Sequence, residues 1–173
     1  MRITAILAIA AAALAILPAS AGQWQQYVNP RFGTAAEIPV SGFRALPPPD
    51  NGDGQEWEAL DGSGRFSISG QFLIPQSYDV DRDFDDLRKL YLQIEKDDGV
   101  TITYSAAGKG WFAFSGTKGD KIIYDRTHLN RDCELPIVDN FYATYKASAR
   151  DLFDPLVTHV AHSLKGTKKG SDC

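Results

Sequence analysis

The sequence has little of what most catalytic sites are built from. Its 173 residues include two cysteines and three histidines, and it contains no Gly-x-Ser-x-Gly motif of the kind that presents a nucleophilic serine. Cys133 lies between Asp132 and Glu134, and two neighbouring carboxylates disfavour the thiolate that a catalytic cysteine needs. We therefore predict no catalytic residue and no bound cofactor.

Metal-binding patterns are equally incomplete. The acids that begin at Asp79 have the spacing of a calcium loop, but Phe84 stands where that loop needs glycine, and Leu90 where it needs a bidentate glutamate. His159 and His162 are three residues apart on a predicted helix, but they lack a third ligand and fall opposite its apolar stripe. The sequence therefore predicts no metal site, and it predicts that both histidines face solvent.

The chain has no block of basic residues and no long apolar run beyond its N-terminus. It carries 18 Lys and Arg against 22 Asp and Glu, a net charge of −4. A mildly acidic chain is a poor partner for nucleic acids or anionic lipids, and no apolar stretch after residue 21 is long enough to span a bilayer. These absences argue against nucleic acid and against a membrane span in the processed protein. They leave an unknown protein or small ligand as the partner.

Apolar residues gather at the N-terminus. Arg2 precedes an apolar run over residues 3–17, and Pro18 is followed by Ala19-Ser20-Ala21, which has the form of an A-x-A cleavage site. As a helix the run would be roughly 22 Å long, shorter than the ~30 Å hydrocarbon core of a bilayer. We predict a cleavable signal peptide over residues 1–21 and a single mature domain over residues 22–173, secreted or periplasmic. An uncleaved anchor is the alternative.

Beyond residue 50, turns separate segments of clear periodicity. Residues 57–60 and 65–74 predict a hairpin, residues 100–104, 111–115 and 121–126 a meander, and residues 137–146 a further strand. Helices are predicted over residues 84–97, with Asp83 as N-cap, and over residues 152–165, with Pro155 in the first turn. This order predicts an α+β fold, in which helices pack on a largely antiparallel sheet.

Residues 22–43 have weaker patterns. They are predicted to be irregular apart from a short edge strand over residues 35–40, because Pro30 and Pro39 argue against a central strand. Four aromatic residues lie here or just after the proline loop that follows: Trp24, Tyr27, Phe32 and Trp57. Because Tyr and Trp dominate binding hot spots, these four rings are candidate binding residues. The alternative is that they cap the open end of the sheet as part of the core.

The two cysteines favour a structural role. An exported chain meets an oxidising environment, and an even number of cysteines suggests pairing. We predict a Cys133–Cys173 disulfide, which closes a loop of 173 − 133 = 40 residues. Pairing between two molecules is the alternative, because Cys173 lies at the end of a predicted flexible tail.

Short motifs at both ends of the mature chain carry a family resemblance. Asn29-Pro30-Arg31-Phe32-Gly33 is followed by Pro39 and Phe43, and Phe153-Asp154-Pro155-Leu156-Val157 leads to Ser163-Leu164. In this order the motifs resemble PsbP/Mog1-like domains and uncharacterised exported bacterial proteins of that shape. The resemblance implies a largely antiparallel sheet of about six strands between helices, used for binding and assembly rather than catalysis. Residues 35–38 and Leu164 depart from the apolar and aromatic pattern of the family.

We therefore expect an exported binding or accessory domain without catalytic activity. The alternative is a small periplasmic hydrolase whose site is assembled from distant loops. An enzyme would need a concave pocket in which titratable groups converge, whereas a binding module would expose an aromatic patch.

Overall fold

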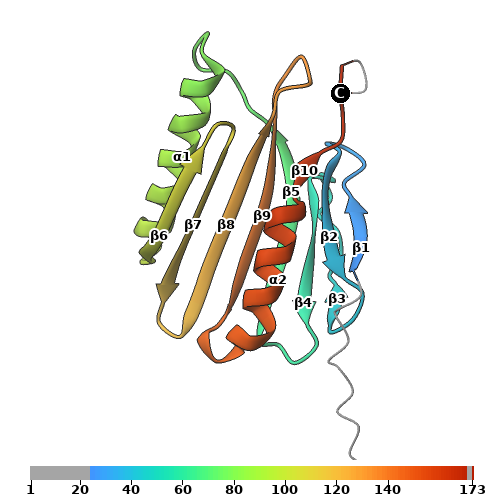
Figure 1. Cartoon of the computed structure of the whole chain (residues 1–173), viewed down its shortest axis with the longest axis vertical. Helices are drawn as coiled ribbons and strands as arrows, with labels where there is room; N and C mark the ends of the chain where they lie inside the picture. Colours follow the sequence, from blue (N-terminus) through green and yellow to red (C-terminus); the bar gives the residue numbers. More distant parts are fainter. Residues whose placement is uncertain (1–23, 171–172) are drawn as a thin grey trace, which may run out of the picture.

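The computed structural model describes residues 24–170 and residue 173. Within these residues the chain forms two antiparallel sheets and two α-helices (Figure 1), which confirms the α+β prediction. The elements are β1 (Trp24–Val28), β2 (Thr34–Pro39), β3 (Phe43–Ala45), β4 (Gly54–Ala59), β5 (Gly64–Phe72), α1 (Val80–Asp97), β6 (Thr101–Gly108), β7 (Trp111–Lys118), β8 (Lys121–Asn130), β9 (Ile137–Lys146), α2 (Arg150–Ser163) and β10 (Lys165–Gly166).

The larger sheet has seven strands in the order β3-β4-β5-β9-β8-β7-β6, against the six or so that the family resemblance implies. It contains the predicted hairpin as β4–β5, the predicted meander as β6–β7–β8, and the predicted later strand as β9. Tight turns at Gly62, Gly110 and Gly119 join these strands, and each glycine has a positive φ that other residues rarely adopt. The local turn chemistry therefore specifies most of the large sheet.

The strand predicted over residues 35–40 is present as β2, but the prediction is wrong in placing it at an edge and in leaving residues 24–28 irregular. β1 and β2 pair antiparallel, and β2 lies between β1 and β10 as the central strand of a three-stranded sheet. Pro39 is compatible with this place because it is the last residue of β2, where its missing N–H removes little from the ladder. The partner on the other side, Lys165–Gly166, is too distant in sequence for a local pattern to reveal.

Both helices begin earlier than predicted. The N-cap of α1 is Asp79 rather than Asp83, and its side chain accepts hydrogen bonds from the backbone N–H groups of Asp81 and Arg82. Asp83 instead lies within the first turn, where its carboxylate accepts from the backbone of Gln76 and Ser77 and fixes the preceding loop. A 3₁₀ turn over residues 147–149 leads into α2, so that Pro155 falls in the second turn of the helix.

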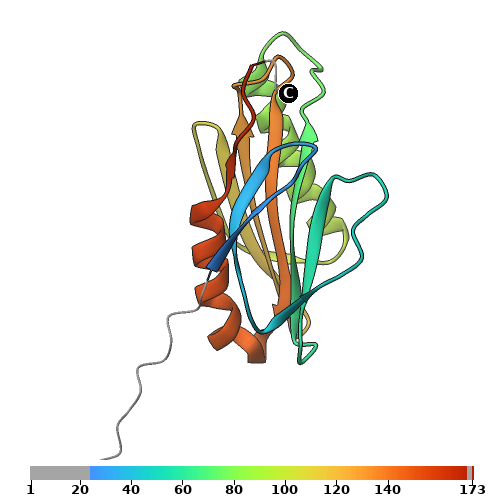
Figure 2. The ribbon, with the colours of Figure 1, turned by 90° about the vertical axis from the view of Figure 1, so that its right-hand side faces the viewer.

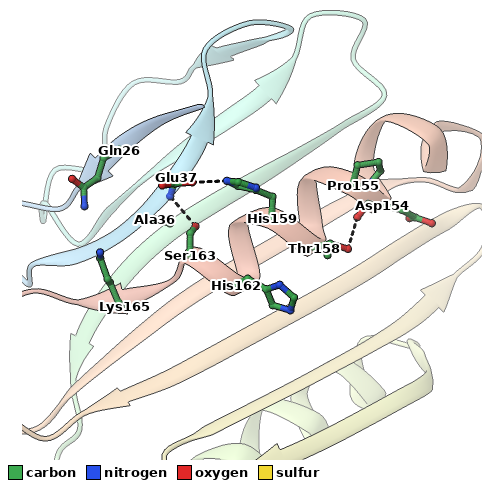
Figure 3. Close-up of a pocket in the computed structure, with 10 residues that line it drawn as sticks. All are labelled: Gln26, Ala36, Glu37, Asp154, Pro155, Thr158, His159, His162, Ser163 and Lys165. Carbon is green, nitrogen blue, oxygen red and sulfur yellow. Dashed lines mark hydrogen bonds and ion pairs between the residues drawn. The ribbon is translucent and has the colours of Figure 1, made fainter. Parts of the chain in front are cut away.

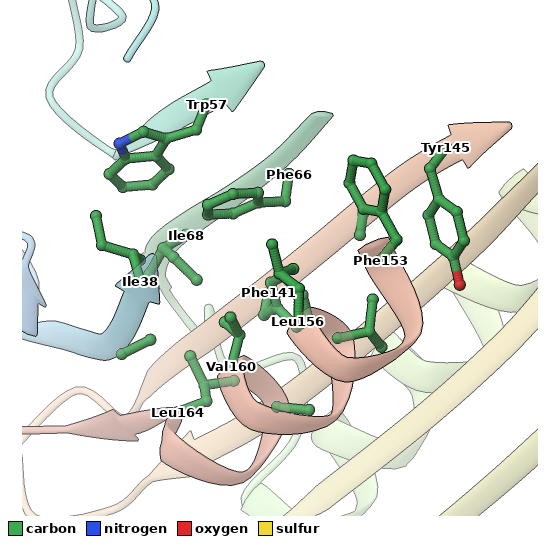
Figure 4. Close-up of a cluster of buried hydrophobic side chains, with 14 of the residues drawn as sticks. Ile38, Trp57, Phe66, Ile68, Phe141, Tyr145, Phe153, Leu156, Val160 and Leu164 are labelled. Carbon is green, nitrogen blue, oxygen red and sulfur yellow. The ribbon is translucent and has the colours of Figure 1, made fainter. Parts of the chain in front are cut away.

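The two helices cover opposite faces of the large sheet (Figure 2). The larger apolar cluster lies under α2, where residues of β2, β4, β5 and β9 meet the helix (Figure 4). The smaller cluster lies under α1 and includes Phe84, Phe112, Phe114 and Val138. No helix in the described part of the chain has the length and hydropathy needed to cross a membrane.

The predicted disulfide joins Cys133 to Cys173, with their Cα atoms 5.7 Å apart. Cys133 lies in the loop between β8 and β9, so the bond ties the tail after α2 to the end of the sheet. Residues before this bond are also held in place: the N–H and the hydroxyl of Thr167 both donate to the Gly33 carbonyl.

Candidate functional site

The four aromatic residues predicted to bind do not form one exposed surface. Trp57 is 7% exposed and Phe32 is 3% exposed, so both belong to the core. Trp57 stacks on Phe66, with ring centroids 5.1 Å apart, whereas Phe32 packs in a separate cluster with Ile137. Trp24 and Tyr27 lie half-buried on β1 against the edge of the larger cluster. The positions of all four rings agree with the alternative given above, in which they cap the sheet as part of the core.

A groove of about 880 Å³ runs between α2 and the β1–β2 pair (Figure 3). Nε2 of His159 on α2 lies 2.6 Å from a carboxylate oxygen of Glu37 on β2, and Trp24 stacks on the imidazole with centroids 3.7 Å apart. The side chain of His159 is 36% exposed, so it faces solvent only in part: β1 and β2, which were not expected beside α2, cover the rest of it. His162 is exposed, as predicted.

The groove holds a serine, two histidines and two acids, but it does not assemble them for nucleophilic catalysis. The Ser163 hydroxyl donates to the backbone carbonyl of Val160 and accepts from the N–H of Glu37. A nucleophilic serine has to donate its proton to a base such as histidine, and here that proton goes to a carbonyl. Within residues 24–170 and 173, no group of three or more His, Cys, Asp or Glu side chains is placed to hold a metal ion.

The aromatic patch lies instead on the part of the large sheet that α2 leaves uncovered. Cross-strand neighbours point to the same face of a sheet, and three rows of neighbours start from residues of β9. The rows are Ala143–Tyr124–Ser115–Tyr104, Phe141–Arg126–Ala113–Ala106 and Asp139–His128–Trp111–Gly108. Since Phe141 and Ala143 pack under α2, the remaining members of each row continue on the same side over β8, β7 and β6.

We call this surface the open face and define it by Tyr104, Trp111, Ser115, Tyr124 and Arg126. Figure 1 shows α2 in front of β9 and β5, with β6, β7 and β8 uncovered on that side. Tyr104 is 52% exposed, and the other four side chains are half-buried. The sequence signal for this surface is the alternation of residues 100–126, but the alternation alone does not say which face a helix covers.

Arg126 is the charged group at the centre of the open face. Its guanidinium lies 4.0 Å from the ring centroid of Trp111, and no ion pair or hydrogen bond within the described residues joins it to a carboxylate. Partial burial lowers the pKa of Arg126, and the nearby Tyr124 and Tyr104 partly offset that effect. The indole of Trp111 in turn lies across Gly108, where a Cβ atom would stand 2.4 Å from its Nε1.

The open face is also the basic part of an acidic chain. Residues 101–130 carry four cations and two acids, a net charge of +2, whereas the whole chain carries −4. Of the two acids, Asp125 is buried on the α1 side of the sheet. Lys109, Lys118 and Lys121 are exposed at the hairpins that border the open face.

No protein-family model matches the chain, and no curated protein matches it either. The function therefore has to follow from the chemistry of the residues described above.

Proposed function

We propose that the protein is an exported binding domain whose open face holds an extended acidic segment of a partner protein. The observation that carries this proposal is the half-buried guanidinium of Arg126, stacked on Trp111 without a carboxylate partner among the described residues. Removing a charge from water costs free energy unless the charge is paired. A carboxylate of the partner supplies the missing pair through two parallel N–H···O bonds.

The composition of the open face supports a protein partner. Interface cores are enriched in Tyr, Trp and Arg, and these are the large side chains present here: Tyr104, Trp111, Tyr124 and Arg126. Between them lies Ser115, which is half-buried and whose small side chain leaves room for a group of the partner. The bordering lysines attract an acidic segment from a distance and increase its rate of association.

Export is the second part of the proposal. The predicted signal peptide, residues 1–21, lies outside the described residues, but the Cys133–Cys173 bond is consistent with an oxidising compartment. We also propose a relation to PsbP/Mog1-like domains, which is supported by an antiparallel sheet between two helices and by the terminal motifs.

Selection from a displayed library of random peptides tests the binding function on the mature domain. We expect the enriched peptides to contain Asp or Glu next to an apolar or aromatic residue, and their binding to weaken as salt increases. Arg126→Ala and Trp111→Ala should each weaken that binding about 30-fold or more, as expected for hot-spot residues.

Arg82→Ala is the matched control, because Arg82 is an exposed arginine on α1, which covers the opposite face. It should leave the affinity unchanged. Peptides that lack acidic residues, or that bind the Arg126→Ala protein as tightly as the wild type, would show that the open face is not the binding surface.

A further inference from the structure

A second recognition site, independent of the open face, lies on the other side of the sheet. A cavity of about 230 Å³ separates the C-terminal half of α1 from β7, β8 and β9. It is lined by Tyr91, Ile94, Glu95, Phe114, Asp125, Asn140 and Tyr142. We call it the α1 cavity. Three of these residues are aromatic and two are acidic, an unusual combination for the space beneath a helix.

Asp125 lies at the bottom of the α1 cavity and is 3% exposed. One of its carboxylate oxygens accepts from the Thr127 hydroxyl at 2.8 Å, and the other accepts from the Asn140 amide at 2.9 Å. A carboxylate oxygen accepts two hydrogen bonds, so each keeps one lone pair available. Within the described residues no Lys, Arg or His pairs with Asp125, and desolvation raises its pKa to about 7. The Asp125 carboxylate is therefore buried and hydrogen-bonded, but no cation among the described residues neutralises its charge.

The other walls of the α1 cavity favour the same kind of occupant. Glu95 comes from α1 and accepts a hydrogen bond from the Tyr142 hydroxyl, and its charge acts on Asp125. Tyr91 accepts a hydrogen bond from the Gln71 amide at 2.6 Å, which fixes its ring beside the cavity. Aromatic faces attract cations through their quadrupoles, so the rings and the two carboxylates act in the same direction.

We propose that the α1 cavity binds a small primary organic ammonium ion, whose N–H groups donate to Asp125 while its alkyl part contacts Tyr91, Phe114 and Tyr142. The volume fits this class, since about 230 Å³ corresponds to roughly seven water molecules of ~30 Å³ each. A metal ion fits less well. Calcium and magnesium sites are built mainly from carboxylates, and the lining of the cavity has only two, with no group of three or more His, Cys, Asp or Glu side chains placed to hold a metal ion among the described residues.

Titration with n-butylammonium, followed by calorimetry and by thermal unfolding, tests the proposal on the mature domain. We expect saturable binding in the millimolar range, and a rise in melting temperature with ligand concentration. Neutral 1-butanol has the same alkyl chain without the charge, and it should bind at least ten times more weakly. Tetramethylammonium has the charge without an N–H donor, and it should also bind more weakly.

Three variants test whether n-butylammonium binds in the α1 cavity. Asp125→Asn keeps the shape of the side chain and should lower the affinity for n-butylammonium at least tenfold. Glu95→Gln should lower it severalfold, and it decides the question should Asp125→Asn fail to fold. Asp97→Asn removes an exposed acid from the same helix and should have no effect. Absence of binding, equal binding of 1-butanol or tetramethylammonium, or unchanged affinity in Glu95→Gln would each overturn the proposal.

Discussion

Trp57 was a candidate binding residue, but its burial assigns it to the core. Its indole lies between Phe66 and Tyr27 in the cluster under α2. Replacing a buried Trp by Ala leaves a cavity, so Trp57→Ala should lower the free energy of unfolding by roughly 3–5 kcal/mol. Trp111→Ala is the matched control on the open face and should cost much less. Urea denaturation of the two variants measures both values. A loss below about 1 kcal/mol in Trp57→Ala would contradict its place in the core.

Asp125 should make the stability of the protein depend on pH. Burial raises the pKa of its carboxyl from about 4 to about 7 in the folded state, so the folded protein holds this proton more tightly than the unfolded chain does. The resulting stabilisation is fully present below about pH 4 and is lost as the pH rises through 7. The groups that face it are Glu95 and Tyr91 of α1 and Tyr142 of β9, and none of them changes in the variant below.

The comparison is between the wild type and Asp125→Asn, whose side chain does not titrate. Between pH 5 and pH 8 the wild type should lose stability relative to the variant, by at most roughly 3 kcal/mol. Urea denaturation at intervals of one pH unit gives this difference directly. A difference that stays constant with pH would mean that Asp125 is ionised normally in the folded protein.

At the level of whole elements, the contact between β2 and β5 depends on a glycine. A Cβ atom at Gly70 would lie 2.4 Å from the Thr34 hydroxyl and 2.5 Å from Cβ of Phe32. Gly70→Ala should therefore force the two sheets apart and destabilise the protein by about 1–3 kcal/mol. Ser67→Ala is the control on the other face of β5 and should cost under about 0.5 kcal/mol. Thermal unfolding of both variants tests this, and equal melting temperatures would contradict the close approach.

The start of α1 provides a smaller test. Asp79 accepts from two backbone N–H groups at 3.0 and 3.1 Å, so Asp79→Ala should cost about 1 kcal/mol. Asp86 lies one turn into the same helix and makes only exposed ion pairs with Arg82 and Lys89, so Asp86→Ala should cost under about 0.5 kcal/mol. The reverse order of these costs, measured by denaturation, would move the N-cap away from Asp79.

The sequence predicts the elements that have clear alternation and turn glycines at their ends. The β4–β5 hairpin and the β6–β7–β8 meander follow from alternation and turn glycines, which act over a few residues. The small sheet does not follow in the same way. β1 and β2 are close in the chain, since Val28 pairs with Ala35, but Pro30 and Pro39 argued against a central strand there, and β10 pairs with β2 from about 130 positions away. Local patterns also cannot predict either candidate site, the open face or the α1 cavity. Alternation places Tyr124 and Arg126 on one face and Asp125 on the other, but only the positions of α1 and α2 show which face is open and which is enclosed.

For the molecule as a whole, the Cys133–Cys173 bond joins the tail after α2 to the buried cluster of Phe32 and Ile137. Closing a 40-residue loop stabilises a protein by about 4 kcal/mol in the chain-entropy model. A reducing agent should therefore lower the melting temperature of the wild type. It should have no effect on Cys173→Ser, which should already melt at the lower temperature. Equal stability of the oxidised and reduced wild type would show that the tail is held by its hydrogen bonds alone.

If the protein is exported as proposed, the pairing of β2 with β10 has a consequence for when it can fold. If the chain crosses a membrane with its N-terminus first, residues 34–39 emerge well before their partners at residues 165 and 166. Until then the buried side chains of Ala35, Ala36 and Ile38 lack both β10 and the helix that covers them. Pairing over such distances forms slowly. The protein should therefore complete its fold only after translocation ends, and before that it should be a substrate for holding chaperones and for proteases at the exit side.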